Sequence, residues 1–199
     1  MEFKNRTLKY DSSLRINMGV RLEKELLRSS FAKIAEELKK DRSFNTGVIS
    51  VHTRLLENVK SEAVVGGHGK GYEKSHRLIS DERELLGGGD EGPAPLEYFI
   101  SGFNFCLQST LVYWSTSLDV PIQSMEMKTR AYWNRRGNYI EGDPAFTKIA
   151  YELSIESPAE ESRIRELVDT AERRCVVHST LKKAVPIESH VTLNGRKLN

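Results

Sequence analysis

The chain has 199 residues, of which 38% are hydrophobic and 29% are charged. This length suits one domain with a buried core, and the charge content excludes an integral membrane protein. The 30 basic and 28 acidic residues give a net charge of +2, which does not indicate binding to nucleic acid or to a membrane surface. No apolar run approaches the roughly 20 residues of a spanning helix. We therefore expect a cytoplasmic protein, whose two cysteines rest as free thiols.

The first half of the chain predicts one helix and a small sheet. Residues 19–40 carry apolar side chains three and four positions apart, which indicates an amphipathic helix. Short alternating segments follow at 48–52, 59–65 and 72–80, with glycines at 66–67 and 69–71 that predict turns. These strands are expected to form a meander.

A glycine-rich run at 86–93 precedes the most apolar helix of the sequence. The run lacks the Lys-Ser/Thr ending of a phosphate-binding loop, so we interpret it as a flexible lead into the helix. Pro95 suits the first helical position, because its missing amide would have had no partner there. Residues 96–118 are apolar on nearly every side, which is typical of a helix enclosed by protein. Cys106 lies in the middle of this helix, among largely apolar neighbours.

Two further strands are predicted at 122–133 and 146–155. In the second, Tyr151, Leu153 and Ile155 alternate with polar residues, so one face should be buried and the other wet. The residues between the two strands, 134–138 and 142–144, are predicted to form turns.

The last helix is expected to start at a capping box, residues 157–160, with proline at the first helical position. We predict that it runs to Lys183 and that Cys175 lies on its packed stripe, with His178 and Leu181 on the same side. A final strand is predicted at 187–193, ending at the turn 194–195.

The cysteines Cys106 and Cys175 both lie on inward stripes of helices that are expected to share one core. Buried free cysteines often serve only as small hydrophobic side chains, so packing alone is one interpretation. A pair in contact supports a second one, because a thiolate oxidised to sulfenic acid can condense with a neighbouring thiol to form a disulfide. Two cysteines are the minimum set for that cycle.

Two other kinds of site are weighed beside the thiol pair. A zinc ion would need Cys175 and His178 together with His76 and Cys106, but the sequence contains no CxxC or HxxxH spacing. A cysteine hydrolase would need a local signature that the sequence does not contain. Neither alternative predicts as much of the pattern as a redox pair does.

Two segments of the sequence resemble the OsmC/Ohr family of osmotically inducible and organic hydroperoxide resistance proteins. The first comprises residues 76–82, 86–88 and 92–99, leading to Cys106. The second comprises residues 171–181 around Cys175, with Val176 where proline is usual in the family. The resemblance divides the chain into an N-terminal extension, 1–46, with the amphipathic helix, and an OsmC-like domain, 47–199.

The resemblance implies an α/β (α+β) fold in which antiparallel sheets wrap around long central helices in an interlocked homodimer. It also implies a thiol-dependent peroxidase that reduces organic hydroperoxides or hydrogen peroxide as an antioxidant in the stress response, without metal or cofactor. By this resemblance Cys106 is the peroxidatic cysteine and Cys175 the resolving one. An external thiol, such as a dihydrolipoyl group, would supply the electrons. The alternative is a non-catalytic dimer on the same fold that binds a small ligand or has a structural role.

The sequence departs from the peroxidase pattern at the two positions that activate the first cysteine in the family. His68 follows the Gly-Gly pair where the family has arginine, and Leu96 stands where the family has glutamate. Glu97 is nine residues before Cys106, so helical geometry turns it away from the cysteine face. These departures are typical of a divergent branch. The candidate supporting residues are Glu97, Arg77, His68 and His178, with Arg54 or a residue of the partner chain as substitutes for the arginine.

Overall fold

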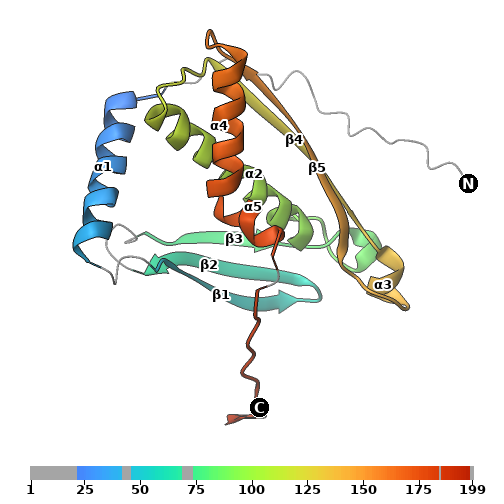
Figure 1. The fold of residues 1–199 in the computed structure, drawn as a ribbon. Helices are drawn as coiled ribbons and strands as arrows, with labels where there is room; N and C mark the ends of the chain where they lie inside the picture. Colours follow the sequence, from blue (N-terminus) through green and yellow to red (C-terminus); the bar gives the residue numbers. More distant parts are fainter. Residues whose placement is uncertain (1–21, 42–45, 69–73, 184, 198–199) are drawn as a thin grey trace, which may run out of the picture.

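The structure is a computed structural model that describes residues 22–41, 46–68, 74–183 and 185–197. A long central helix, α2 (Pro95–Ser117), is covered by α4 (Glu161–Arg174) and α5 (Val176–Leu181). A hairpin of two long strands lies along α2, and a three-stranded sheet lies at one end of the molecule, below α5 (Figure 1). The sheets consist of β1 (Val48–Glu57), β2 (Lys60–His68) and β3 (His76–Ser80), and of β4 (Ser124–Trp133) and β5 (Phe146–Glu156). The expected α/β fold of antiparallel sheets around long helices is confirmed.

The core lies between α2, α4 and the inner face of the β4–β5 hairpin. Leu107 and Leu111 of α2 meet Leu167 and Ala171 of α4, and all four are fully or almost fully buried. Each buried leucine contributes about 1.5–3 kcal/mol relative to an exposed one. The inward residues of the hairpin pack against this core and are Met125, Met127, Ile149, Tyr151, Leu153 and Ile155, so the predicted buried face of the second strand is confirmed.

The N-terminal amphipathic helix is α1 (Lys24–Lys40), and residues 19–21 of the prediction lie outside the described residues. The helix contacts α2 through Phe31, whose ring packs edge-on against Trp114 with centroids 5.7 Å apart. Arg28 forms an ion pair with Asp119 at 2.7 Å. Its remaining apolar side chains are largely exposed, so α1 is an added layer on α2 rather than part of the core.

The predicted meander is present, because β2 pairs with both β1 and β3 in antiparallel register. The turn between β1 and β2 lies at Asn58, which adopts a φ of 44°, and asparagine tolerates this left-handed conformation better than most residues. The prediction of a turn at 66–67 was wrong. Both glycines continue β2 and pair with Ser50 and Ile49, while the predicted turn at 69–71 lies outside the described residues.

The glycine-rich segment before α2 is organised around a buried carboxylate, and not simply a flexible lead. Asp81 is buried, and its Oδ2 accepts hydrogen bonds from the amides of Gly89 at 2.9 Å and Glu91 at 3.3 Å. Burial disfavours the ionised form, but these amides and that of Glu82 outweigh it and hold the pKa of Asp81 below its ordinary value. The segment also contains the short 3₁₀ helix η3 (Glu84–Leu86).

The central helix begins where the sequence predicts, with Pro95 at its first position. Glu97 reaches back to accept a hydrogen bond from the amide of Ala94 at 3.0 Å, which satisfies one of the free donors at a helix start. The connection between β4 and β5 differs from the predicted turns, since it contains the short helix α3 (Arg135–Tyr139). The Asn134 side chain caps α3 by accepting from the Gly137 amide at 3.2 Å.

The last predicted helix is in fact two helices, α4 and α5, separated at Cys175. The prediction placed a single helix from 157 to 183 because the apolar stripe continues past Cys175 with helical spacing. Cys175 instead adopts extended angles, φ −72° and ψ 120°, after its amide makes the last hydrogen bond of α4 to Ala171. The start was also placed too early. Ser157 accepts from the Ala159 amide in a turn, and α4 begins at Glu161.

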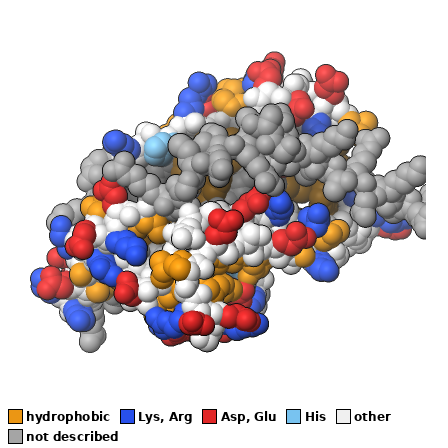
Figure 2. Space-filling view, turned by 90° about the horizontal axis from the view of Figure 1, so that it is seen from above, with side chains coloured by type: hydrophobic (Ala, Val, Ile, Leu, Met, Phe, Trp, Pro, Cys, Tyr) orange, Lys and Arg blue, Asp and Glu red, His pale blue; other side chains and the backbone are white. Residues whose placement is uncertain are grey.

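The predicted final strand is reduced to a small hairpin, β6 (Thr192–Leu193) and β7 (Arg196–Lys197). The predicted turn at its tip is confirmed, since Asn194 and Gly195 have φ angles of 50° and 77°. Two successive residues with positive φ form the tight turn that suits the twist of a hairpin. Basic and acidic side chains are interspersed over the face seen in Figure 2, and no helix within the described ranges could cross a membrane.

Candidate functional site

The two cysteines contact each other, with their sulfur atoms 3.3 Å apart. Cys106 lies about three turns into α2, and Cys175 lies at the junction of α4 and α5. Both are free thiols. Because the sulfur atoms of a disulfide are about 2.0 Å apart, an approach of about 1.3 Å would be enough for a bond between them.

The two thiols differ in access to solvent and in hydrogen bonding. Cys175 is completely buried, with 0% of its surface exposed, whereas Cys106 is partly exposed. The Cys175 thiol donates to the sulfur of Cys106, and its own sulfur accepts from the backbone amide of His178 at 3.5 Å. A reagent from solvent therefore reaches Cys106 more readily than Cys175.

The surroundings of Cys175 favour its protonated form. Burial raises the pKa of the Cys175 thiol, and the contact with Cys106 raises it further. The amides of His178 and Val177 act in the opposite direction but do not compensate. Cys175 therefore rests as a neutral thiol at physiological pH.

A polar group of three side chains lies beside Cys175. The Tyr151 hydroxyl of β5 donates to Oε1 of Glu172, which is one turn before Cys175 in α4. Oε2 of Glu172 lies 4.0 Å from Nε2 of His178, which is one turn after Cys175 in α5. Burial and the contact with Glu172 raise the pKa of Tyr151, so its phenol stays neutral. We call Tyr151, Glu172 and His178 the polar triad.

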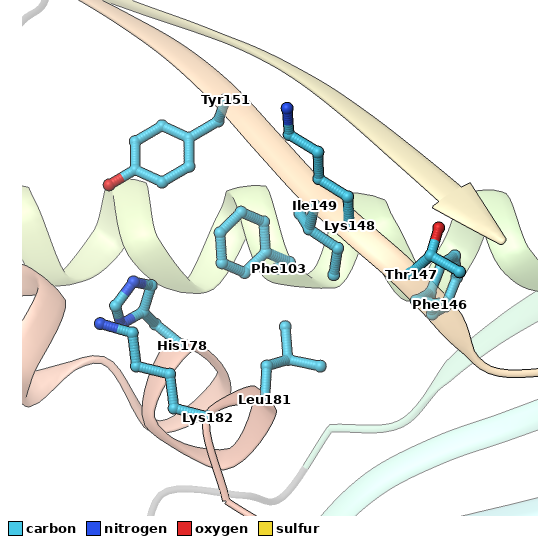
Figure 3. Close-up of a pocket in the computed structure, with 9 residues that line it drawn as sticks. All are labelled: Phe103, Phe146, Thr147, Lys148, Ile149, Tyr151, His178, Leu181 and Lys182. Atoms are coloured by element: carbon cyan, nitrogen blue, oxygen red, sulfur yellow. The ribbon is translucent and has the colours of Figure 1, made fainter.

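Tyr151 and His178 of the polar triad line a pocket of about 290 Å³ between α2, α5 and β5. Figure 3 shows Tyr151 and His178 together at one end of this pocket, Phe103 in its middle and Phe146 with Thr147 at the other end. The His178 ring stacks on Phe103, with ring centroids 6.2 Å apart. The pocket therefore combines an apolar wall with a polar end next to the thiol pair.

Comparison with known proteins identifies the family. A family model described as OsmC-like protein matches residues 87–190, slightly more than half of the chain, including both cysteines and the polar triad. This chain belongs to the OsmC-like family. No curated protein sequence matches it.

Solved structures confirm the OsmC-like fold at low sequence identity. An OsmC-like protein from Mycoplasma pneumoniae is 21% identical, with a TM-score of 0.53, and the match covers 68% of this chain and 87% of that one. An OsmC-like protein of unknown function from Vibrio cholerae has a TM-score of 0.52 at 7% identity, covering 68% and 94%. A Psychrobacter arcticus 273-4 protein, assigned to the osmotic stress and detoxification response, has a TM-score of 0.52 at 12% identity, covering 68% and 89%.

The structure places only one of the candidate supporting residues of this OsmC-like protein beside the thiols. His178 lies there as part of the polar triad. Glu97 forms an ion pair with Arg83 at 2.6 Å at the start of α2, nine residues and about 13.5 Å of helix from Cys106. Arg77 and Arg54 both pair with Glu62 across the β1–β2–β3 sheet. The side chain of His68 lies outside the described residues.

Of the four zinc ligands weighed as an alternative from the sequence, His76 does not lie with Cys106, Cys175 and His178. His76 lies exposed on β3 and pairs with Val65 in the sheet register, away from the elements that carry the cysteines. Among the described residues no group of three or more potential metal ligands is found.

Tyr151 and Glu172 are the neighbours of Cys175 that sequence reasoning missed. The alternating pattern places Tyr151 on a buried strand face, but it does not indicate that the Tyr151 hydroxyl meets a carboxylate on a helix 21 residues later. The available signal was that a buried tyrosine usually needs a hydrogen-bond partner for its hydroxyl. Glu172, three residues before Cys175 on a predicted helix, was the nearest acid.

Proposed function

We propose that this OsmC-like protein is a thiol-dependent peroxidase in which Cys106 attacks the peroxide and Cys175 resolves the oxidised product. The observation that carries the proposal is the contact of two free thiols, 3.3 Å apart, of which Cys106 is partly exposed and Cys175 is buried. Family membership and the resemblance to hydroperoxide resistance proteins support the substrate class.

The chemistry proceeds in three balanced steps. The Cys106 thiolate attacks the O–O bond of a hydroperoxide ROOH, which gives Cys106 sulfenic acid and the alcohol ROH once the leaving oxygen takes a proton. The Cys175 sulfur then attacks the Cys106 sulfur, the S–O bond breaks, and water leaves. An external dithiol reduces the disulfide and is itself oxidised to a disulfide, which restores both thiols.

The contrast between the thiols suits this order of events. The attacking thiol must be reachable by peroxide, and Cys106 is the partly exposed one. The resolving thiol needs only to reach the first sulfur, and Cys175 is buried against it. A sulfenic acid that condenses at once with a neighbour is protected from further oxidation.

Titration of thiols with cumene hydroperoxide tests the proposal. One equivalent should remove both free thiols of a reduced chain, and a dithiol should restore them. Cys106→Ser should lose no thiol, while Cys175→Ser should form a sulfenic acid that a cyclic 1,3-diketone traps. If two thiols per chain persist after equimolar peroxide, Cys106 is not peroxidatic, and the non-catalytic alternative is favoured.

We also propose that the protein acts as a homodimer, because one face of the β1–β2–β3 sheet is apolar and no described helix or strand outside the sheet covers it. Ile49, Val51 and Leu55 of β1 point to the same face and are 75%, 56% and 65% exposed. By register, Leu78 of β3 continues this face through Ala63 of β2. An apolar patch of this kind marks an interface, and a second copy is the occupant that the family resemblance implies.

Light scattering of the purified protein tests the homodimer. The wild-type chain should have twice the mass of one chain, and Val51→Asp should reduce it to the monomer mass. His52→Asp is the matched control, because its side chain lies on the opposite face of the same strand. A monomeric wild-type protein, or a dimer that Val51→Asp leaves intact, would contradict this interface.

A further inference from the structure

A second pocket, of about 430 Å³, lies at the α3 end of the β4–β5 hairpin and has no part in the three steps above. Its walls come from the η3 segment, the start of α2, and α3 with the two strand ends beside it, which lie together at the lower right of Figure 1. Neither cysteine lines this pocket. Much of its lining is apolar and consists of rings, those of Trp133, Tyr139, Phe146, Pro95 and Pro144.

The charged side chains of this pocket form two sets. In the first set, Arg83 pairs with Glu97 at 2.6 Å and is also attracted by the charge of Glu82. The second set is Arg135 alone, whose guanidinium lies over the ring of Trp133, 5.7 Å from the ring centre. Arg135 forms no ion pair with an acidic side chain in the part of the chain that the structure describes. An anionic group is therefore the complement that the second set lacks.

Helix α3 presents three of its five residues to the pocket. Arg135, Asn138 and Tyr139 are spaced i, i+3 and i+4, which places them on one side of the helix, and all three line the pocket. Arg136 is turned about 100° around the axis from Arg135, does not line the pocket and pairs with Glu141. The pocket side of α3 thus combines a cation, an amide and an aromatic ring.

The walls around α3 are held in place by contacts within the chain. The Asn134 side chain accepts from the amide of Gly137 at 3.2 Å and donates to the carbonyl of Asp143 at 2.9 Å, which ties α3 to the start of β5. The ring of Phe146 stacks on that of Phe99, with centroids 5.6 Å apart and an interplanar angle of 9°. A pocket whose walls are already ordered loses less entropy when a ligand binds.

We propose that this pocket binds a planar aromatic carboxylate, with the carboxylate on Arg135 and the aromatic ring against Tyr139 and Phe146. A guanidinium stacked on an aromatic ring keeps the N–H groups of its edge free, and their planar fork fits a carboxylate. Rings in the wall favour a ligand that is itself aromatic. At about 30 Å³ for each water-sized group, the pocket has room for about 14 non-hydrogen atoms. Two fused rings with one carboxylate have this size, and their binding requires neither a thiol nor a peroxide.

Isothermal titration calorimetry of the full chain with 2-naphthoate measures this binding directly. The titration should saturate at one ligand per chain. Two comparison ligands separate the two parts of the proposal, since 2-naphthalenemethanol has the rings without the charge and decanoate has the charge without the rings. Each should bind at least about fivefold more weakly, as expected for loss of an exposed ion pair or of aromatic contacts. Added salt should weaken the binding of 2-naphthoate but not that of the alcohol.

Arg135→Gln should weaken the binding of 2-naphthoate by at least about fivefold and leave that of 2-naphthalenemethanol unchanged. A merely structural effect on the pocket would weaken both ligands. Arg135→Lys keeps the charge but loses the planar fork, so its affinity for 2-naphthoate should lie between those of the wild type and Arg135→Gln. Arg136→Gln is the matched control, because this neighbouring arginine does not line the pocket. Tyr139→Ala removes part of the aromatic wall and should weaken both ligands.

The proposal would be overturned by a titration that does not saturate, by equal affinity for the three ligands, or by equal effects of Arg135→Gln and Arg136→Gln. If Arg135→Gln does not fold, Arg135→Lys and Tyr139→Ala are measured in the same way, and unchanged affinity for 2-naphthoate in both would overturn it as well. The calorimetry uses no peroxide. A failure of the peroxidase proposal is therefore distinct, because it appears only in the titration of thiols with cumene hydroperoxide.

Discussion

Val176→Pro should stabilise the protein, although most substitutions in a folded domain destabilise it. Val176 is the first residue of α5 and is 73% exposed. Its amide donates to no atom among the described residues, so proline removes no hydrogen bond there. Cys175, the residue before it, already has φ −72° and ψ 120°, in the extended region that a following proline favours. The position thus meets each requirement for a proline at the start of a helix.

The expected gain comes from the unfolded chain, which loses conformational freedom when proline is introduced. A compatible replacement of this kind is worth about 0.4–1 kcal/mol. For a domain of this size each kcal/mol shifts the melting temperature by about 2–4 °C, so Val176→Pro should melt about 1–4 °C higher. Differential scanning calorimetry of the reduced protein measures this shift.

Val177→Pro is the matched control at the next residue. The Val177 amide contributes a hydrogen bond to the sulfur of Cys175, and proline would remove it. Proline at 177 would also disfavour helical angles at Val176. This variant should lose at least about 1 kcal/mol. If Val176→Pro lowers the melting temperature, or if both variants behave alike, the described junction between α4 and α5 is wrong.

Two further predictions concern stability. Gly88→Ala should destabilise the protein by about 1–3 kcal/mol, because a Cβ at residue 88 would lie 1.9 Å from the carbonyl oxygen of Glu82. In Gly102→Ala, the added Cβ meets nothing within 4 Å in α2, so this variant should gain up to about 1 kcal/mol of stability. Equal melting temperatures of the two variants would contradict both predictions. Because the pKa of Cys175 is raised in the folded protein, the thiol of the unfolded chain ionises first as the pH rises. The stability that the neutral Cys175 thiol contributes is therefore fully present below the ordinary thiol pKa of 9.0 and is lost as the pH rises above that value. Urea midpoints of the reduced protein between pH 7 and 10 should show this loss, and Cys175→Ala should reduce the slope; identical slopes would refute the assignment.

The sequence predicted correctly those helices and strands that carry a clear apolar pattern in their own residues. Apolar spacing placed α1 and α2, and strict alternation placed β5 with the correct buried face. The position of the β1–β2 turn was not predictable from glycine, because glycines 66 and 67 are accommodated within a strand and Asn58 supplies the positive φ. The turn position follows from the pairing of β1 with β2, which is a property of the sheet rather than of the segment.

The thiol pair was predictable, but the groups around it were not. Cys106 lies within α2 against the core, as helical spacing predicted, whereas Cys175 is buried as predicted but lies at a break between two helices. The link between Tyr151 and Glu172 joins a strand to a helix and depends on how α4 packs, which no local pattern encodes. The partners of Arg77 and Arg54 also depend on the sheet rather than on neighbouring residues in the sequence. Both arginines pair with Glu62, which lies directly opposite Arg54 in the register of the sheet.

The break between α4 and α5 is the feature that links the fold to the proposed chemistry. In a continuous helix the amides of Val177 and His178 would bond to carbonyl groups four residues earlier, and Cys175 would have no donors. The extended angles of Cys175 turn both amides toward its sulfur instead. Amide donors that already point at a developing negative charge stabilise it without reorganisation. Burial keeps Cys175 protonated at rest, and the two amides are in place for the thiolate once its proton leaves. The family's usual proline at position 176 would enforce the same break, so this chain, with valine there, must maintain it by the packing of α4 and α5 on α2.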